Sequence, residues 1–507
     1  MKNTIPPFDP FILQLLDQIR SVAPNQVPIY LVGGAVRDHL LGKEIKDLDF
    51  VLDGNTASIS LAVKRILKAR SFILDDNRQT ARVIHKLPNG ENILLDFVKL
   101  TGFSLIEDLQ NRDFTINAMA VELSQPGFLL DPLNGRSDLA QGILKTCSEN
   151  SMQDDPLRVL RGIRIALNYG LQIDDASSQL MTETAPSLAR ISGERLRDEL
   201  FIILALSQPD KALRMMDRFN CLLPILPELE LLKSVPVSAP HVHGLWDHTL
   251  QVAVYLNALL DAILQNEQSI ILSYPFASQL IERIWSFQPE LKKYLINDIQ
   301  QERSRKNLLL FSALYHDTGK PETMQLGKDR RLHFRGHAKE SLLAVTNRAI
   351  ALALSNHEIE LISTVVANHM RIHDLANLPN APSSKAIYRY FRDCSEYGID
   401  ICLLSLADMW ATYEHTLSKD QWIRELDVVR SLLHAFWFQT SEVVNPPKLL
   451  SGDDLRDVFG LTPGPIYAEI LDALKEEQAG MNLRTREEAL AFVQTILQKK
   501  GVNPGKK

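Results

Sequence analysis

The chain has 507 residues, which predicts roughly three domains of ~100 to 200 residues each. Its 45% apolar and 23% charged residues are ordinary for a soluble globular protein. No stretch approaches the ~20 apolar residues of a membrane span, and the N-terminus lacks a secretion signal, so we expect a cytoplasmic protein without a membrane partner. The net charge of -7 gives no global support for nucleic-acid binding. Four cysteines without a CxxC pair argue against a zinc ribbon or a disulfide framework.

The first 52 residues predict a helix followed by a ligand-binding turn. Residues 1–26 predict one amphipathic helix with Phe11, Leu15 and Ile19 on a face. Residues 31–52 then predict a strand end, a turn, a short helix and a second strand. Gly33 and Gly34 let the backbone turn tightly and approach a ligand closely. The first amide groups of the short helix would point at an anion.

Acidic residues mark the second strand, DLDFVL. Asp47 and Asp49 project to one side of it because successive side chains alternate between the faces of a sheet. Two neighbouring carboxylates repel unless a hard cation lies between them, and Mg²⁺ held by carboxylates and phosphates is typical of nucleotidyl transfer. After an NG hairpin turn at positions 89 and 90, a further strand places Asp96 as a third carboxylate. A plain turn with solvated acids at the strand edge is the alternative on these residues alone.

A long helical region begins near residue 154. Arg158, Arg161 and Arg164 recur every three residues and therefore share one broad helix face. We expect Asp155 on the same helix, one turn from Arg158, so that both side chains address one planar ligand. A salt-bridged solvated face is the alternative. A proline-rich boundary at 222–242 precedes a nearly all-helical stretch to about residue 440.

Six candidate metal ligands are spread over this second helical stretch in the order H, HD, H, H, D. The HD pair closes an apolar helix, and Gly319 and Lys320 follow it. A lone histidine on a helix is more often structural than a ligand, but six residues in this order are hard to explain that way. The candidate ligands are His248, His316, Asp317, His337, His369 and Asp408.

The motifs GGAVRD, DLD, NRDFTINAMA, DPLNGRSDL, DDPLRVLRGIRIA and ISGERLRDEL occur in this order. Together they resemble the signature motifs of class II CCA-adding enzymes and bacterial poly(A) polymerases, the tRNA nucleotidyltransferases. The resemblance implies an α/β polymerase-beta-like head followed by a mostly all-α neck, HD domain and tail. The expected domains are an N-terminal helix at 1–28, the nucleotidyltransferase head at 29–145, a helical neck with base-selecting and RNA-binding helices at 146–235, an HD-type phosphohydrolase domain at 236–440 and a C-terminal helical tail at 441–507.

The resemblance also implies roles for individual residues. Asp47 and Asp49 would hold the Mg²⁺ ions that activate a 3'-hydroxyl and stabilise the triphosphate, and Asp96 is the further catalytic candidate. The residues expected to contact the nucleotide are Gly33, Gly34, Arg37, Asp38, Arg112, Asp113, Asn117, Asp155, Arg158 and Arg161.

Asp155 and Arg158 would act as a protein template for the incoming base. A carboxylate only accepts and a guanidinium only donates hydrogen bonds, so the pair matches an exocyclic amine beside a ring acceptor. Cytosine and adenine share that edge, whereas uracil and guanine would leave a buried group unpaired at a cost of roughly 1 to 3 kcal/mol per bond. Arg161 would stiffen or extend the pair.

Two features depart from the family pattern. Asn111 stands where the motif usually has the first of two arginines, and the linker before SLIEDLQNRDF is only VKLTGF. CCA-adding members typically carry a longer flexible loop there, so the short linker favours addition of CMP to tRNA from CTP, beside a separate A-adding enzyme. Full CCA addition with CTP and ATP, and poly(A) polymerisation on RNA 3' ends, are the alternatives.

The second constellation resembles the HD superfamily of metal-dependent phosphohydrolases over roughly residues 240–415. The resemblance implies that His248, His316, Asp317 and Asp408 bind one divalent transition metal, and that His337 with His369 completes a second site. The gap between His248 and the HD pair is longer than expected for the family. It predicts an extra helical excursion over about 265–305.

Overall fold

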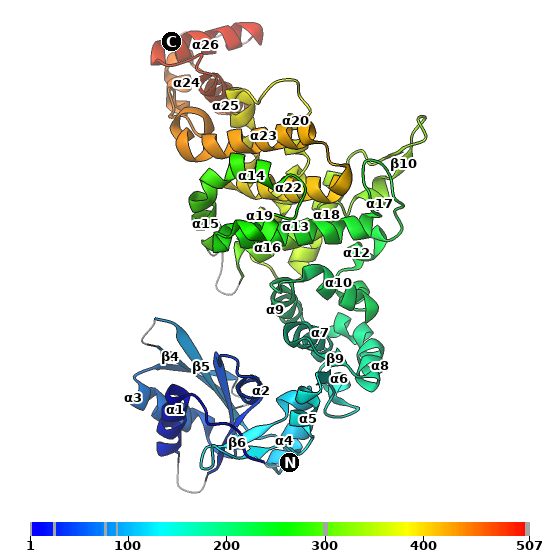
Figure 1. The fold of residues 1–507 in the computed structure, drawn as a ribbon. Helices are drawn as coiled ribbons and strands as arrows, with labels where there is room; N and C mark the ends of the chain where they lie inside the picture. The colour runs from blue at the N-terminus through cyan, green and yellow to red at the C-terminus, as the bar shows by residue number, and fades with distance from the viewer. Residues whose placement is uncertain (1–2, 24–26, 76–78, 88–89, 298–302, 502–507) are drawn as a thin grey trace. The chain divides into compact units, whose positions relative to one another are not determined.

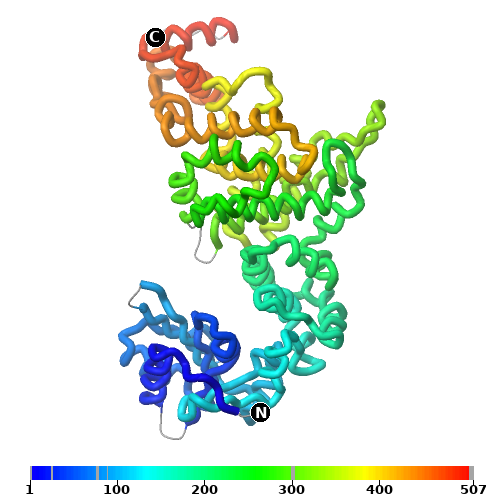
Figure 2. The backbone as a smooth tube through the Cα atoms, in the orientation of Figure 1, coloured from blue at the N-terminus to red at the C-terminus, as the bar shows by residue number. Residues whose placement is uncertain are grey.

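The computed structural model describes residues 3–23, 27–75, 79–87, 90–297 and 303–501. The chain divides into two compact units (Figures 1 and 2). The first unit comprises Met1–Ile191 and Arg214–Ile225, and the second comprises Ser192–Leu213 and Leu226–Lys507. A large sheet lies in the first unit, whereas the second is almost entirely helical. This arrangement confirms the predicted fold class of an α/β head followed by helical domains.

A seven-stranded sheet organises the first unit, in the order β3-β4-β5-β2-β1-β6-β7. β2 and β5 run parallel, and the other neighbours are antiparallel. The strands are β1 (Ile29–Val32), β2 (Asp47–Leu52), β3 (Arg70–Asp75), β4 (Thr80–Lys86), β5 (Asn92–Lys99), β6 (Ala120–Glu122) and β7 (Leu129–Leu130). A separate parallel pair joins β8 (Ile143–Leu144) to β9 (Gln172–Ile173).

The register of this sheet places the predicted acids side by side. Asp49 of β2 lies opposite Asp96 of β5. Leu48 and Phe50 are fully buried, which confirms that the acids and the apolar residues of β2 alternate between its faces. The predicted hairpin also forms between β4 and β5, with Gly90 at φ +92°, while position 89 lies outside the described residues.

Helices flank the sheet and continue beyond it. α2 (Gly34–Leu40) contacts β1 and β2, and α3 (Thr56–Leu67) contacts β3, β4 and β5. The other helical elements of the first unit are α1 (Pro10–Ser21), α4 (Leu105–Gln110), η1 (Thr115–Asn117), α5 (Gly135–Ala140), α6 (Ser151–Asp154), α7 (Arg158–Tyr169), α8 (Asp175–Thr184), η2 (Ala185–Arg190) and α11 (Leu222–Ile225). The unit boundary at residue 214 divides α10 (Pro209–Arg218).

The predicted N-terminal helix is shorter than expected. α1 begins only at Pro10, because the side chain of Asp9 caps the amide of Phe11 and proline at the first helical position sets the starting φ. Upstream, Thr4 forms an isolated bridge with Phe128 instead of a helical turn. The predicted apolar face also differs, since Phe11 is 38% exposed.

The prediction that Asp155 lies on the arginine helix is wrong. α6 ends at Asp154, α7 begins at Arg158, and Asp155 between them is extended, with φ -148° and ψ 96°. The cause is Pro156, whose ring disfavours helical backbone in the preceding residue. Asp155 is therefore positioned by a bend and not by helical spacing.

The second unit is built around long packed helices. α13 (Leu245–Gln265) packs against α22 (Gly398–Tyr413) and α16 (Arg305–Tyr315), and nearly every residue of α22 is buried. The described part of the predicted excursion is helical, as expected: η3 (Gln268–Ile271), α14 (Ala277–Ile284), η4 (Trp285–Phe287) and α15 (Gln288–Ile296).

Further helical elements complete the second unit. They are α9 (Gly193–Leu204), α12 (Pro227–Leu232), α17 (Lys320–Thr323), α18 (His337–Ala351), α19 (Asn356–Asn368), α20 (Arg371–Ala376), α21 (Ser384–Cys394), η5 (Ser395–Tyr397), η6 (Glu414–Thr416), α23 (Lys419–Phe438), η7 (Thr440–Val444), α24 (Gly452–Phe459), α25 (Pro465–Ala479) and α26 (Arg486–Lys499). Within the described ranges, no helix is long and apolar enough to cross a membrane.

One element of the second unit was not predicted. β10 (Gln325–Leu326) and β11 (Leu332–His333) form an antiparallel hairpin in a stretch that the sequence favours as helical. Its turn is closed by a hydrogen bond from the Gly327 amide to the Arg331 carbonyl, with Arg330 at φ +60°. The pattern missed it because two-residue strands carry too little alternation to be recognised.

The fold makes a testable prediction at Gly135, in the first turn of α5. A Cβ added there would lie 2.1 Å from the carbonyl oxygen of Thr115, which is a backbone atom that cannot swing away. We expect Gly135→Ala to lower the free energy of unfolding by about 2 kcal/mol, the usual cost of overpacking. Gly127→Ala is the matched control, because nothing lies within 4 Å of its added Cβ. Thermal and denaturant unfolding measure both, and equal stability of the two variants would contradict the prediction.

Candidate active sites

A cavity of about 920 Å³ lies in the first unit, at the edge of the sheet where β1 and β2 meet α2 and α7. All the residues expected to contact the nucleotide line it, together with Asp47 and Asp49. Its walls are Gly33, Gly34, Ala35, Arg37, Asp38, Lys43, Glu44, Lys46, Asp47, Asp49, Arg112, Asp113, Asn117, Asp155, Arg158, Arg161, Arg164, Ile165, Asn168 and Tyr169. The structure thus brings the motifs of residues 33–164 to one place.

The paired carboxylates face this cavity and repel each other. Burial and the neighbouring Asp96 carboxylate raise the pKa of Asp49 to about 6. The same two causes raise the pKa of Asp47. Because a divalent cation stabilises the ionised forms that the surroundings disfavour, this donor pair fits Mg²⁺.

Asp96 lies beside the pair but does not line the cavity. Its two carboxylate oxygens accept hydrogen bonds from Arg82 Nε at 2.7 Å and Arg82 Nη2 at 2.8 Å. This bidentate pairing fixes the orientation of the Asp96 carboxylate. In this arrangement Asp96 acts on Asp49 through its charge, as a neighbour within the sheet.

Gly33 allows the close approach that its motif predicts. Its φ of +74° is favoured only for glycine, and a Cβ there would lie 3.4 Å from both Arg112 Nη1 and Asp49 Oδ2. Any larger residue would therefore press on one basic and one acidic wall of the cavity. α2, which follows Gly33, has only seven residues, so the phosphate contact expected there depends on side chains as much as on helix amides.

A chain of hydrogen bonds joins the cavity walls. Arg37 Nη1 donates to Asn117 Oδ1 at 2.6 Å, and Asn117 Nδ2 donates to Asp113 Oδ1 at 3.0 Å. Asp113 Oδ2 lies 2.9 Å from Arg161 Nη2. Burial alone would raise the pKa of Asp113, but Arg161 and Asn117 lower it below its usual value. Hydrogen bonds and an ion pair therefore connect the predicted residues of α2, η1 and α7.

Backbone carbonyl oxygens hold the Arg158 side chain in place. Its guanidinium donates to the carbonyl oxygens of Asn111 at 2.8 Å, Arg112 at 3.2 Å and Ser151 at 3.0 Å. Asp155 lines the same cavity from the extended bend before α7. Both members of the predicted pair therefore border the cavity, and the segment around Arg112 anchors Arg158.

Tyr169 is a cavity residue that the motifs did not indicate. The Arg37 guanidinium and the Lys43 ammonium each lie 4.1 Å from the centre of its ring. Its hydroxyl donates to Asp38 Oδ1 at 2.7 Å. Helical spacing places Tyr169 on the same face of α7 as Arg158 and Arg161, so the sequence could have indicated Tyr169.

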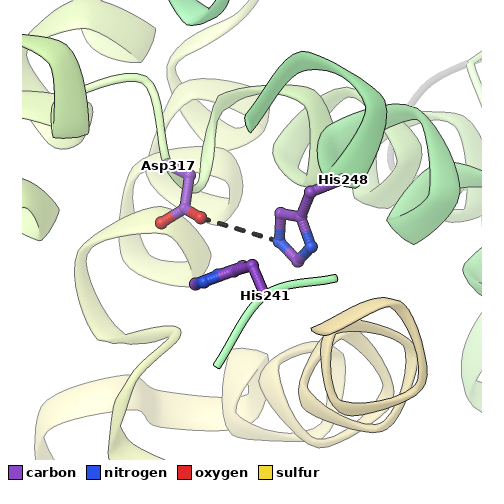
Figure 3. Close-up of side chains that lie close together, drawn as sticks. All are labelled: His241, His248 and Asp317. Carbon is purple, nitrogen blue, oxygen red and sulfur yellow. Dashed lines mark ion pairs between the residues drawn. The ribbon is translucent and has the colours of Figure 1, made fainter. Parts of the chain in front are cut away.

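A second centre lies among the helices of the second unit, and the predicted ligands converge on it. Three groups each place one ligand atom per residue within 4.8 Å of the others. They are His241, His248 and Asp317 (Figure 3); His248, His316 and Asp408; and Asp317, His337 and His369. All six predicted ligands are included, and Asp317 or His248 belongs to every group.

Backbone carbonyls orient three of the histidines. The Nδ1 atoms of His316, His337 and His369 lie 2.7, 2.9 and 2.7 Å from the carbonyl oxygens of residues 313, 334 and 366. A carbonyl only accepts, so Nδ1 carries the proton in each neutral ring and Nε2 then presents a lone pair. Nε2 of His337 and Nε2 of His369 are 3.1 Å apart, with no proton left to share. A cation between them removes this repulsion.

The charge balance of the centre also favours metal binding. Nε2 of His248 lies 3.1 Å from Asp408 Oδ1, and Nε2 of His316 lies 3.2 Å from Asp317 Oδ2, all of them buried or nearly so. Burial opposes protonation of His316, but the adjacent Asp317 carboxylate raises its pKa. Burial likewise opposes ionisation of Asp317, yet His316 and Lys320 hold the pKa of Asp317 well below its usual range. Ionised Asp317 among imidazole nitrogens is a donor set for a divalent transition metal.

The sequence did not predict two residues that lie at this centre. His241 faces His248 and Asp317 (Figure 3), and its Nε2 lies 3.2 Å from Lys320 Nζ. His373 links Asp408 Oδ2 at 3.0 Å to Glu425 Oε1 at 2.9 Å. His241 lies in the proline-rich boundary, where no helical pattern marks it as a ligand. His373 follows His369 by four residues, a spacing that could have indicated it.

His373 and its partners form one wall of a further cavity of about 240 Å³. Burial opposes protonation of His373, but Glu425 and Asp408 raise its pKa well above the usual value. The cavity is also lined by Asp317 and by Lys320, whose Nζ lies 2.6 Å from Asp317 Oδ2. The centre therefore opens onto a space with cationic groups at its walls, as a phosphate would require.

Comparison with known proteins identifies the family. The family described as "Poly A polymerase head domain" matches residues 29–145, "Probable RNA and SrmB- binding site of polymerase A" matches 170–232, and "HD domain" matches 245–409. An A-adding tRNA nucleotidyltransferase of Deinococcus radiodurans is 29% identical over 92% of this chain and 94% of that protein. The chain belongs to the tRNA nucleotidyltransferase family. It is a nucleotidyltransferase of the CCA-adding group that carries an HD domain.

Other members of the CCA-adding group resemble the chain to different extents. A CC-adding tRNA nucleotidyltransferase of Geobacter sulfurreducens is 42% identical over 35% of this chain and 40% of that protein, so this match spans less than half of the relative. The structure of a CCA-adding enzyme in an apo form covers 98% of this chain and 96% of its own, with a TM-score of 0.58 and 23% identity. At that identity the likeness shows a shared fold.

The HD centre makes a prediction about metal-dependent stability. We expect Mn²⁺ to raise the melting temperature of the chelator-treated wild type, because binding to the folded state adds about 2.7 kcal/mol at a concentration 100 times the dissociation constant. Asp317→Asn, which removes an anion shared by two ligand groups, should abolish the increase. Asp329→Asn, an exposed carboxylate in the same unit, is the control and should retain it. A full increase in Asp317→Asn would contradict the assignment.

Proposed function

We propose that the first unit transfers CMP from CTP to the 3'-hydroxyl of tRNA without a nucleic-acid template. The observation that carries the proposal is the cavity that joins Asp47 and Asp49 to the basic wall of Arg112, Arg158 and Arg161. Such a cavity offers a metal pair on one side and triphosphate and base contacts on the other. Relatives named as acting on tRNA, and related structures with tRNA, ATP and CTP, support the substrate classes.

The reaction is an in-line displacement at the α-phosphorus. The 3'-hydroxyl oxygen forms a bond to that phosphorus, the bond to the bridging oxygen breaks, and pyrophosphate leaves while the hydroxyl proton is lost. Mg²⁺ held by Asp47 and Asp49 would supply Lewis-acid activation and charge neutralisation. Arg37 and Arg112 would bind the phosphates, and Asp113 and Asn117 would hold Arg37 and Arg161 in place through the hydrogen bonds described above.

Asp155 and Arg158 would select the base. The carboxylate accepts from the exocyclic amine of cytosine, and the guanidinium donates to the adjacent ring acceptor. Arg158 keeps donors directed at carbonyl oxygens around Arg112, so base contact and nucleotide contact are made by one connected segment. Adenine presents a similar edge, and the pair by itself therefore does not separate CTP from ATP.

The short linker at residues 98–103 favours CC addition. β5 ends at Lys99 and α4 begins at Leu105, so the five residues between them leave no room for a loop that reaches Asp155 and Arg158. On this proposal a separate A-adding enzyme completes the tRNA end, in the cytoplasm. Full CCA addition and poly(A) polymerisation are the alternatives. An A-adding and a CC-adding relative are each 29% identical to the chain, over 92% and 91% of its length.

For the HD domain we propose metal-dependent hydrolysis of a phosphoester. His248, His316, Asp317 and Asp408 would hold one divalent transition metal, and His337 with His369 would complete a second site beside Asp317. The bound metal would supply a water of lowered pKa as the nucleophile. Lys320, placed between Asp317 and His241, would bind a phosphate oxygen and steady the leaving group.

The nucleotide specificity can be tested with three tRNA substrates. We offer tRNA lacking its end, tRNA ending in C and tRNA ending in CC, each with CTP, ATP or both, and resolve the products on sequencing gels. CC addition predicts growth by cytidines up to CC and no adenosine. Asp47→Ala should lower the rate at least 1,000-fold, since it removes a metal ligand, while leaving phosphoester hydrolysis unchanged. Adenosine added to tRNA ending in CC would refute CC-only addition.

A second prediction concerns Arg158. Its replacement by alanine removes both the base donor and the anchor to the carbonyls around Arg112. We expect the preference for CTP over UTP to fall 10- to 100-fold, which corresponds to about 1.4 to 2.7 kcal/mol. The matched control is Arg65→Ala, an exposed arginine on α3 of the same unit. Unchanged discrimination in Arg158→Ala, measured as a ratio of kcat/KM, would contradict its role.

A further inference from the structure

The unpredicted hairpin is a distinct feature of the HD region. β10 and β11 join α17, which begins at Lys320, to α18, which begins at His337. Figure 1 shows the hairpin extending away from the packed helices of its own unit. We call residues 325–335 the arm. The four residues at its tip, Lys328 to Arg331, are all exposed.

The arm is strongly basic in a chain of net charge -7. Its eleven residues, QLGKDRRLHFR, contain four cationic side chains and a single acid. The acid, Asp329, accepts from the Arg331 amide at 3.1 Å and pairs with His333. The four cations form no ion pair with another residue in the described ranges. They are Lys328, Arg330, Arg331 and Arg335.

The base of the arm touches the metal centre. The Phe334 carbonyl oxygen lies 2.9 Å from Nδ1 of His337 and thereby sets the orientation of that ligand. The Phe334 ring lies 5.6 Å from the ammonium of Lys320, which in turn contacts Asp317. A chain of contacts therefore runs from the basic tip to two residues at the HD centre.

We propose that the arm binds the phosphates of an RNA strand, so that the HD centre acts on a phosphoester carried by RNA. Adjacent guanidinium groups on an exposed turn suit repeated phosphates, because each can form bidentate, charge-assisted hydrogen bonds. Local cations can bind a polyanion in an acidic protein, since counterion release is a local effect. The inference rests on the proposed hydrolysis by this centre, and it adds the class of substrate and the surface that holds it.

The test uses the full chain and the variant Lys328→Ala/Arg330→Ala/Arg331→Ala. One substrate is bis(p-nitrophenyl) phosphate with Mn²⁺, which is too small to reach the arm, and the other is a 12-nucleotide RNA with a 3'-phosphate. We expect the variant to hydrolyse the small ester within twofold of the wild-type rate and to show a KM for the RNA ester at least 10-fold higher in low salt. The slope of log KM against log salt concentration should fall by about 2, at roughly 0.7 for each of three lost single-strand contacts.

A control variant separates the arm from general loss of charge. Lys293→Ala/Lys419→Ala/Lys448→Ala removes three exposed cations elsewhere in the second unit. It should leave the KM for the RNA ester within twofold of wild type. An equal rise in KM for both triple variants, or no rise in the arm variant, would overturn the proposal.

Hydrogen exchange separates failure of the arm from failure of the proposed hydrolase. Wild type that hydrolyses neither substrate would refute the hydrolase but still allow RNA binding to be measured. We expect amides at 325–335 to be protected on addition of the same RNA in wild type and not in the arm variant. Absence of this protection, or protection by anionic phosphatidylserine vesicles alone, would refute RNA binding by the arm.

Discussion

Both centres of this protein depend on the same electrostatic constraint: donor atoms of like character are held together more closely than they tolerate without a cation. In the first unit, burial and Asp96 raise the pKa of Asp49 to about 6. In the second unit, the lone pairs of two imidazole nitrogens face each other across 3.1 Å. The fold supplies the rigidity that keeps these groups in place, and metal binding relieves the repulsion that this rigidity creates.

The two centres obtain this rigidity in different ways. In the sheet, the parallel pairing of β2 with β5 fixes Asp49 opposite Asp96, and Arg82 on β4 holds Asp96 from the other side. Among the helices, His316 and His369 lie at the ends of α16 and α19 and His337 at the start of α18, where backbone carbonyl oxygens orient the rings. A sheet positions carboxylates by register, whereas a helical domain positions imidazoles by helix ends.

The sequence predicted those features that depend on local periodicity. Alternation in β2 placed Asp47 and Asp49 on one side, and the order of the motifs indicated the head. Asp155 was misplaced because helical spacing was extended across Pro156, although the proline itself argued against it. The pairing of Asp96 with Arg82 required the register of the hairpin around Gly90. These contacts follow from turn and proline chemistry that the sequence contains.

Other features could not be predicted because they depend on tertiary packing. His241 precedes the first recognised ligand by seven residues and joins the centre only because its segment packs beside α13 and the HD pair. The network of His373, Asp408 and Glu425 connects α20, α22 and α23. Because the three residues lie on different helices, the spacing within any one helix does not relate them. Such contacts are set by how helices pack, which spacing along one helix does not reveal.

A chain of hydrogen bonds connects the short linker to Arg158, which is proposed to select the base. Thr101 in the linker donates to Asp108 through both its amide and its hydroxyl, at 3.1 and 2.6 Å. Asp108 in turn accepts from Arg112 at 3.2 Å, and the Arg112 carbonyl accepts from Arg158. Each step is a hydrogen bond of a charged group, so a displacement of the linker would be transmitted to Arg158.

A linker of six residues tied to α4 has little freedom to move in this way, and the arrangement that suits the first base is therefore expected to persist through later additions. A longer loop would have to release these contacts before it could reorient Arg158, which gives loop length a mechanical connection to the choice between C and A.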